Sequence, residues 1–397
     1  MRHLLMAGAA LGLFAAPLRP AAGQTAQEPV AQIPFELHRN KILVPVWIGA
    51  RGPYTFILDT GAPSSVLNSF RLAEALGATI ERRVQVSGAG DGPAQPAGIT
   101  TPVGMAVGQA SLDASPLVVV DLADQLAAAS GRVYDGILGR PLFNRYVVRM
   151  DFQRRLLELY DRSDYRAPAG AEVIPIRLEG GHPHFDTEVT LMSGERVRAD
   201  VVIDTGARGA LLLDAGEGTR VPIPVGAEEM VLGRGARGWV RGKVGVVAEV
   251  ALGGVSARGV VTAFVPDALG ATPGADGNLG VELLRRFAVT FDYAGGRMVL
   301  EPTPGLGDPW PLDLSGITLR AGGEDWSVLS IADVLPGSPA ERAGIRTGDV
   351  IVRLDGIATS TLETLELRFR QPGALALDLD RAGTAVSARL VLPAPSR

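Results

Sequence analysis

Two copies of one short motif carry residues that could perform acid–base chemistry. Residues 56–62 read FILDTGA, and residues 201–207 read VVIDTGA. A lone carboxylate at the end of an apolar strand is costly, because burial disfavours its charged form. Two carboxylates that meet can share one proton, and such a pair can activate a water molecule to cleave an amide bond. We therefore expect Asp59 and Asp204 to act together.

The residues that follow each aspartate have physical roles beside such a pair. Gly61 and Gly206 would allow the backbones of the two turns to approach each other closely. The hydroxyl groups of Thr60 and Thr205 could form hydrogen bonds across the junction and hold the carboxyl groups in one plane. A single Asp-Thr-Gly would more often be an ordinary turn, so the prediction depends on the second copy.

The surroundings of the motif also occur twice, in the same order. The two aspartates are 145 residues apart, and so are Gly88 and Gly233, which begin Gly-rich loops. The sequence GILG at 136–139 matches GNLG at 277–280 with an offset of 141. The 50 glycines and 28 prolines indicate many turns. We expect a duplicated, mainly β fold with few helices. Helices are expected at Ser69–Leu76, Leu122–Ala129 and Leu283–Phe287.

The two Gly-rich loops are expected to be hairpin flaps that close over a bound substrate. A plain hairpin without this role is the alternative. The second loop, GRGARG, formally matches a dinucleotide-binding fingerprint, but a strand and not a helix follows it. We therefore expect no cofactor. The residues expected at the flaps and the substrate cleft are Gly88, Ala89, Gly90, Gly233, Arg234, Gly235 and Trp239.

The duplicated motif resembles that of the retropepsin and pepsin family of aspartic proteases, over roughly residues 33–302. Both halves carry the apolar-apolar-Gly element of this family, although Asn278 replaces an apolar residue in the second. The resemblance implies that Asp59 and Asp204 are the catalytic pair. It also implies two acid-protease β-barrel halves that form a single-chain version of the retropepsin dimer. Their expected limits are 30–162 and 172–303.

Three other residues refine this resemblance. Ala62 and Ala207 follow the glycines, as in retropepsins, whereas pepsin-like enzymes usually have Ser or Thr there. We therefore expect a mildly acidic pH optimum, because a hydroxyl donor that would lower a carboxyl pKa is missing. Arg140 resembles an arginine that braces the retropepsin dimer junction, and an exposed side chain is the alternative.

Two further groups of polar residues were considered as sites. His182 and His184 could bind a metal, but they are expected in a surface turn without a third ligand. Ser64 and Ser65 have no suitably spaced histidine and are expected to be structural. We predict no metal.

The N-terminus is expected to direct export. Residues 1–23 show the charged, apolar and small-residue order of a signal peptide, and an uncleaved anchor in the inner membrane is the alternative. The chain has no cysteine and a net charge of −5, so neither disulfides nor a basic surface for nucleic acid are expected. A periplasmic or extracellular location is predicted.

The C-terminal residues 313–393 resemble the PDZ domains of bacterial periplasmic proteases. The similarity rests on LPGSPAERAGI at 335–345 and RTGDVIVRLDG at 346–356. Such domains bind a C-terminal peptide as an added strand. The loop that would hold its carboxylate includes Ser315, Gly316 and Ile317, and a helix at Thr361–Arg370 would face the groove.

Together these features predict an exported, monomeric aspartic endopeptidase that acts on protein or peptide substrates. The PDZ domain would recruit substrates or regulate cleavage. The alternative is a peptide-binding scaffold that has the retropepsin-like fold without catalytic activity.

Overall fold

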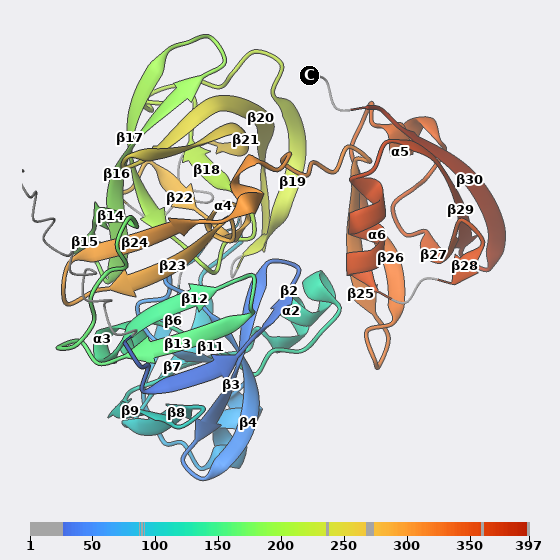
Figure 1. Ribbon diagram of the computed structural model, residues 1–397. Coiled ribbons are helices and arrows are strands. Elements are labelled where there is room, and N and C mark those ends of the chain that lie inside the picture. Colours follow the sequence, from blue (N-terminus) through green and yellow to red (C-terminus); the bar gives the residue numbers. More distant parts are fainter. Residues whose placement is uncertain are drawn as a thin grey trace, which may run out of the picture.

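The structure is a computed structural model and describes residues 27–394, apart from 87, 89, 91, 236–237, 267–273 and 359–360. The predicted signal peptide at 1–23 lies outside the described residues. The strands form four sheets, so the expected mainly β fold is confirmed. Figure 1 shows two β-rich bodies in contact and a smaller third body beside them.

The first body is built on a ten-stranded sheet that carries Asp59 just after a central strand. Three apolar residues, Phe56, Ile57 and Leu58, bring this strand into the core, where each is at most 3% exposed. The strands in sheet order are β6 (Ile80–Val86), β7 (Gln95–Thr100), β10 (Val118–Val120), β5 (Val66–Leu67), β11 (Gly136–Leu138), β4 (Arg51–Leu58), β3 (Lys41–Ile48), β8 (Val103–Val107) and β9 (Ala110–Ser115), with β2 (Glu36–His38) against β3. The helices are α1 (Phe70–Leu76), α2 (Ala123–Ser130) and α3 (Arg140–Arg145).

The second body is built on an eight-stranded sheet that carries Asp204 just after β17. The sheet curls, because β16 pairs with both β17 and β20. Its strands are β15 (Arg177–Glu179), β16 (His182–Leu191), β17 (Arg196–Ile203), β22 (Gly277–Leu279), β18 (Leu211–Asp214), β21 (Val255–Val265), β20 (Gly238–Leu252) and β19 (Glu228–Gly235). The short helix α4 (Val281–Leu284) follows β22.

A shared six-stranded sheet joins these two bodies. Strands β12 and β23 pair at its centre, with Val148 opposite Phe291, and one apolar core continues through both bodies. The strands are β1 (Ala31–Pro34), β13 (Leu156–Tyr160), β12 (Val147–Asp151), β23 (Phe287–Asp292), β24 (Arg297–Pro302) and β14 (Glu172–Pro175). The position of one body is therefore fixed relative to the other.

The third body has its own apolar core and a six-stranded sheet. Its strands are β25 (Ile317–Gly322), β26 (Val328–Val334), β27 (Val350–Leu354), β28 (Ile357–Ala358), β29 (Gly373–Arg381) and β30 (Thr384–Leu392), and its helices are α5 (Pro339–Arg342) and α6 (Leu362–Phe369). The connection before it includes the 3₁₀ turn η1 (Pro304–Gly307). The guanidinium of Arg286 donates to backbone carbonyls of Gly305, Leu306, Asp308 and Pro309 and stacks on Trp310 at 3.4 Å. This connection is held against the second body.

The structure corrects two local expectations. Helix α3 was not predicted, because its six residues are too few to show helical periodicity. His182 and His184 do not lie in a surface turn but in β16, where His184 is 3% exposed. No helix among the described residues is long and apolar enough to span a membrane.

We predict that removal of one aromatic ring at the joint between the first two bodies strongly lowers stability. Phe143 on α3 is fully buried and packs edge-to-face on Phe291 (5.7 Å) and stacked on Tyr293 (5.2 Å), both from the second body. Phe143→Ala should lower the free energy of unfolding by about 3–5 kcal/mol, because the cavity lies at this joint. Urea unfolding measures the change, with Phe70→Ala on α1 as the control. A loss below about 1 kcal/mol would contradict the assignment.

Candidate active site

The two Asp-Thr-Gly turns meet where the first and second bodies join. The hydroxyl of Thr60 donates to the carbonyl of Ile203 (2.7 Å), and that of Thr205 donates to the carbonyl of Leu58 (3.0 Å). Each hydroxyl also accepts the backbone N–H of the other threonine at 2.9 Å. Both threonines have no exposed surface. This reciprocal network ties the ends of β4 and β17 together.

The glycines of the turns lie against the carboxyl groups of the opposite body. A Cβ atom added to Gly61 would lie 2.7 Å from Oδ1 of Asp204, and one on Gly206 would meet the carboxyl of Asp59. Each glycine N–H donates to Oδ1 of the aspartate in its own turn, at 2.8 Å in both cases. Only a residue without a side chain fits this approach, so the motif requires glycine here.

The carboxyl of Asp59 binds its proton unusually tightly. Burial and the nearby charge of Asp204 raise the pKa of Asp59 to about 7, against the opposing effects of Lys41 and the Gly61 N–H. The carboxyl of Asp59 also hydrogen-bonds that of Asp204. The pair therefore holds one proton over a range that extends to neutral pH, as an acid–base pair requires.

Two basic residues next to the pair were not predicted. Lys41 begins β3, beside β4, and its Nζ donates to the carbonyl of Gly206. His182 begins β16, beside β17, and interacts with the backbone of Gly61. Burial lowers the pKa of both side chains. The sequence contains one weak indication of Lys41 and His182: each begins the strand that precedes a strand leading into Asp-Thr-Gly.

Asn278 was noted in the sequence only as a departure from the apolar pattern. The structure places it on β22 with its Nδ2 2.9 Å from Oδ2 of Asp204. The matching residue of the first body is Ile137, on β11. The two carboxyl groups therefore have different neighbours at this position.

A cavity of about 610 Å³ opens above the pair. It is lined by Asp59, Asp204 and the β19–β20 hairpin, including Gly233 and Trp239, and it extends to the third body. Gly88 and Gly90 of the first Gly-rich loop are not among the lining residues. Of the other predicted flap residues, Ala89 lies outside the described residues, Arg234 is opposite Trp239 in the hairpin, and Gly235 is opposite Gly238.

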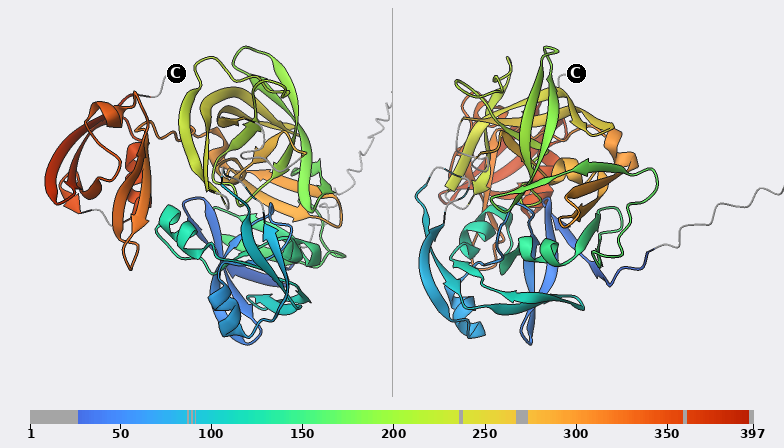
Figure 2. Two further views of the ribbon diagram at one scale, coloured as in Figure 1. Left: turned by 180° about the vertical axis from the view of Figure 1, so that it is seen from behind. Right: turned by 90° about the vertical axis from the view of Figure 1, so that its left-hand side faces the viewer.

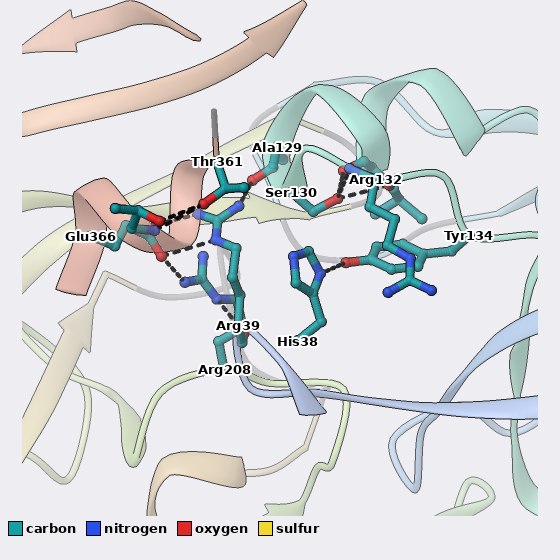
Figure 3. A network of polar contacts seen from close by, with 11 residues as sticks. His38, Arg39, Ala129, Ser130, Arg132, Tyr134, Arg208, Thr361 and Glu366 are labelled. Carbon is teal, nitrogen blue, oxygen red and sulfur yellow. Dashed lines mark hydrogen bonds and ion pairs between the residues drawn. The ribbon is translucent and has the colours of Figure 1, made fainter. Parts of the chain in front are cut away.

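The third body docks beside this cavity through one carboxylate. Figure 3 shows Glu366 of α6 between two arginines of the first two bodies. Oε2 of Glu366 accepts from Nε of Arg39 and from Nη2 of Arg208, both at 2.9 Å, and Oε1 pairs with Nη2 of Arg39. Burial raises the pKa of Glu366, but Arg208 and Arg39 outweigh it and hold this pKa at about 2. Arg208 lies four residues after Asp204, so the docking contact adjoins the pair.

The groove between β25 and α6 is the place where a PDZ domain holds a peptide, and here it is partly occupied. Figures 1 and 2 place α2 beside β25, and the two are in contact. A Cβ on Gly131, just after α2, would lie 3.7 Å from Leu362 of α6 and 3.9 Å from Ala321 of β25. Gly131 thus lies near one residue of each wall of the groove.

In the predicted carboxylate-binding loop, one backbone N–H already donates to a side chain of the loop itself. Ser315 is fully buried, and its Oγ accepts the backbone N–H of Ile317 at 3.0 Å. Gly316 has φ +73°, and a Cβ there would collide with Ser338. Gly316 and Ile317 line the cavity. One N–H that could hold a peptide carboxylate is therefore already in use.

The other candidate residues from the sequence form contacts that support the fold. His184 lies 3.2 Å from the carboxyl of Asp200, and Ser65 Oγ accepts the N–H of Gly139 at 3.2 Å. A Cβ on Gly181 would lie 2.9 Å from the Arg140 guanidinium, so Arg140 reaches the second body. Among the described residues no cluster of three side chains could hold a metal ion.

Comparison with known families identifies two domain types. Residues 44–142 match the family described as "Aspartyl protease", and residues 330–369 match the family described as "PDZ domain". The chain thus carries an aspartyl protease family domain, which suggests a peptidase, followed by a PDZ domain.

Two individual proteins are similar over short stretches. HhoA of Synechocystis sp. (strain ATCC 27184 / PCC 6803 / Kazusa), named as a serine protease, is 53% identical over 57 residues, which is 14% of each chain. The chain therefore spans only a small part of the length of this relative. The PDZ domain of HtrA3, crystallised with the phage-derived ligand FGRWV, is 24% identical, with coverage of 19% of this chain and 80% of that chain and a TM-score of 0.18.

The raised pKa of Asp59 predicts a pH-dependent stability. Because its pKa is about 7 in the folded chain and near 3.8 ordinarily, the folded state retains a proton that the unfolded state releases. Stability from this group is therefore lost as pH rises from about 4 to about 7. Asp59→Asn should raise the free energy of unfolding at pH 7 by about 1–4 kcal/mol, and by little at pH 4. Urea unfolding at both pH values tests this, with the exposed Asp124→Asn as control. A less stable Asp59→Asn variant at pH 7 would contradict it.

Proposed function

We propose that residues 30–303 form a single-chain aspartic endopeptidase made of two duplicated acid-protease halves, 30–162 and 172–303. The observation that carries this proposal is the reciprocal Thr60–Thr205 network, which brings Asp59 and Asp204 together under one cavity. The equivalent topology also supports it: β11 runs parallel to β4, and β22 runs parallel to β17. In this proposal the duplication would extend the protease fold beyond the matched residues 44–142.

In this proposal the pair hydrolyses a peptide bond with one proton and one water molecule. The ionised carboxylate takes a proton from water while the water oxygen attacks the carbonyl carbon. The protonated carboxyl donates its proton to the carbonyl oxygen, which gives a neutral gem-diol. The proton taken from water then passes to the amide nitrogen as the C–N bond breaks, and one hydroxyl of the gem-diol returns a proton to the carboxylate that had donated, which restores the singly protonated pair. On closing over a substrate, the β19–β20 hairpin with Trp239 would keep other water out of the cavity.

We propose that the PDZ domain, 313–393, regulates the endopeptidase more than it recruits substrates. The contact of α2 with β25, the position of Gly131 near both walls of the groove and the bond from Ile317 to Ser315 all oppose peptide binding in the docked state. A tail peptide would have to displace the end of α2, which lies beside the active-site cavity. Export to the periplasm or beyond, with inner-membrane anchoring as the alternative, is proposed from residues 1–23 alone.

The catalytic proposal predicts complete dependence on both aspartates. Asp59→Asn and Asp204→Asn should each lower peptide cleavage at least about 10³-fold, because neither variant can both accept and donate the required protons. Wild-type activity should be greatest at mildly acidic pH and fall as pH rises through about 7, where Asp59 loses its proton. Cleavage of casein or a peptide library, with and without pepstatin, measures these effects.

The variants also distinguish the alternative function. Equal cleavage by wild type and both variants would exclude the pair as the catalyst. A wild type that cleaves nothing but binds tail peptides would favour a catalytically inactive scaffold. An activity maximum below about pH 3 would contradict the expected range.

The docking contact predicts a change in peptide binding. Glu366→Gln should weaken the contact with Arg39 and Arg208, because a neutral amide leaves both guanidinium groups without their counter-charge. We expect binding of C-terminal peptides to tighten about 5- to 50-fold, since less energy is needed to free the groove. Fluorescence polarisation with a fluorescent tail-peptide library measures it. Glu324→Gln, an exposed change of the same charge in the same domain, is the control. Weaker or unchanged binding in Glu366→Gln would show that docking does not restrict the groove.

A further inference from the structure

The two carboxyl groups of the pair differ in the number of hydrogen-bond donors around them. Asp204 accepts from the N–H of Gly206 (2.8 Å) and of Ala207 (3.0 Å) at Oδ1, and from Asn278 (2.9 Å) at Oδ2. Within the described residues, the donor to Asp59 apart from its partner carboxyl is the N–H of Gly61, at 2.8 Å. Donors stabilise the ionised form of a carboxyl group. The negative charge is therefore better stabilised on Asp204.

The difference at Oδ2 arises at one position of the repeat. The residue before the leucine of the Gly-x-Leu-Gly element is Ile137 in the first body and Asn278 in the second. Both belong to a short strand that runs parallel to the motif strand, with Ile137 opposite Ile57 and Asn278 opposite Val202. One carboxyl thus has an amide at a position where the other has a hydrocarbon side chain.

The orientation of the Asn278 amide has an energetic cost, and the bond to Asp204 accounts for this orientation. Asn278 is 8% exposed, and its Oδ1 is buried without a hydrogen-bond partner in the described structure. A buried polar atom without a partner is unfavourable. Rotating the amide would place Oδ1 against the carboxylate oxygen and lose the charge-assisted bond, which is stronger than a neutral one. The arrangement fits a carboxylate at Asp204.

We propose that Asn278 is a positioning residue that holds Asp204 as the carboxylate, so that the proton of the pair resides on Asp59. This inference rests on the proposed endopeptidase function and assigns its two roles. Asp204 accepts the proton of the attacking water, and Asp59 donates its proton to the carbonyl oxygen of the peptide bond. Asn278 acts through Asp204, whose Oδ2 accepts from its amide.

The other titratable and charged groups near the pair remain the same when Asn278 is replaced. They are Lys41 at the start of β3, His182 at the start of β16, Arg140 at the start of α3 and Tyr293 after β23. Lys41 donates to the Gly206 carbonyl, and the nearby carboxylates raise its pKa against burial. A change that moves only one side of the pH profile can therefore be attributed to the amide.

Asn278→Leu removes the donor and keeps the number and branching of the side-chain heavy atoms. The singly protonated pair contains the Asp204 carboxylate, so losing its donor makes uptake of a second proton easier. The acid limb of the kcat/KM profile should therefore move up by about one pH unit or more. The alkaline limb should stay in place, because it separates two protonation forms of the pair that both contain the Asp204 carboxylate. A merely structural role would lower activity at all pH values without moving the acid limb.

Ile137→Asn is the reciprocal variant, which places a donor beside Asp59. It stabilises the ionised form of Asp59, so the alkaline limb should move down while the acid limb stays. If either variant folds poorly, the other still tests the proposal. An acid limb that does not move in Asn278→Leu would overturn it.

A readout without catalysis separates this proposal from the proposed function. Carboxyl ¹³C resonances of labelled aspartate, assigned with Asp59→Asn and Asp204→Asn, report which residue titrates at higher pH. We expect Asp59 in the wild type, and a titration of Asp204 that moves up in Asn278→Leu. If no peptide is cleaved but these titrations are as expected, the endopeptidase function fails and the role of Asn278 stands. An Asp204 that titrates above Asp59 in the wild type would overturn the assignment.

Discussion

The structure depends on the burial of two carboxyl groups at one point. Neither Asp59 nor Asp204 could be kept at the end of an apolar strand alone, because an isolated buried carboxylate loses its solvation. Together they share a proton, and the Thr60–Thr205 network fixes their backbones from below. The shared six-stranded sheet and the continuous apolar core hold the two bodies in the relation that this contact needs.

The site is close to symmetric in its backbone and asymmetric in its side chains. The glycines and threonines occupy matching places in both turns, as a proton-sharing pair requires. At the moment of reaction one carboxyl group must be protonated and the other ionised, and two identical groups can meet this need by sharing one proton. A repeat within one chain can in addition make its two carboxyl groups different. Asn278, at the position of the repeat that Ile137 occupies in the first body, supplies such a difference.

The third body adds a separate level of organisation. Glu366 connects α6 to the loop that follows the second motif, and the connection is held by Arg286 against the second body. The PDZ groove, the end of α2 and the active-site cavity are therefore neighbours. This proximity is the physical basis of the regulation that we propose.

The sequence alone determined those elements that are encoded by neighbouring residues or by a repeated pattern. The apolar stretches before both Asp-Thr-Gly triplets predicted buried strands, the constant offset predicted their repetition, and the long PDZ strings predicted the C-terminal domain that residues 330–369 match. Only the tertiary structure brought in Lys41, His182 and the Asn278 bond, and it moved the histidines from a turn into a strand. Among the described residues, it also left Gly88 and Gly90 out of the cavity lining and placed α2 against β25 of the PDZ domain. These features depend on contacts between residues far apart in the chain, and a pattern of neighbouring residue types carries no information about which distant side chains will meet.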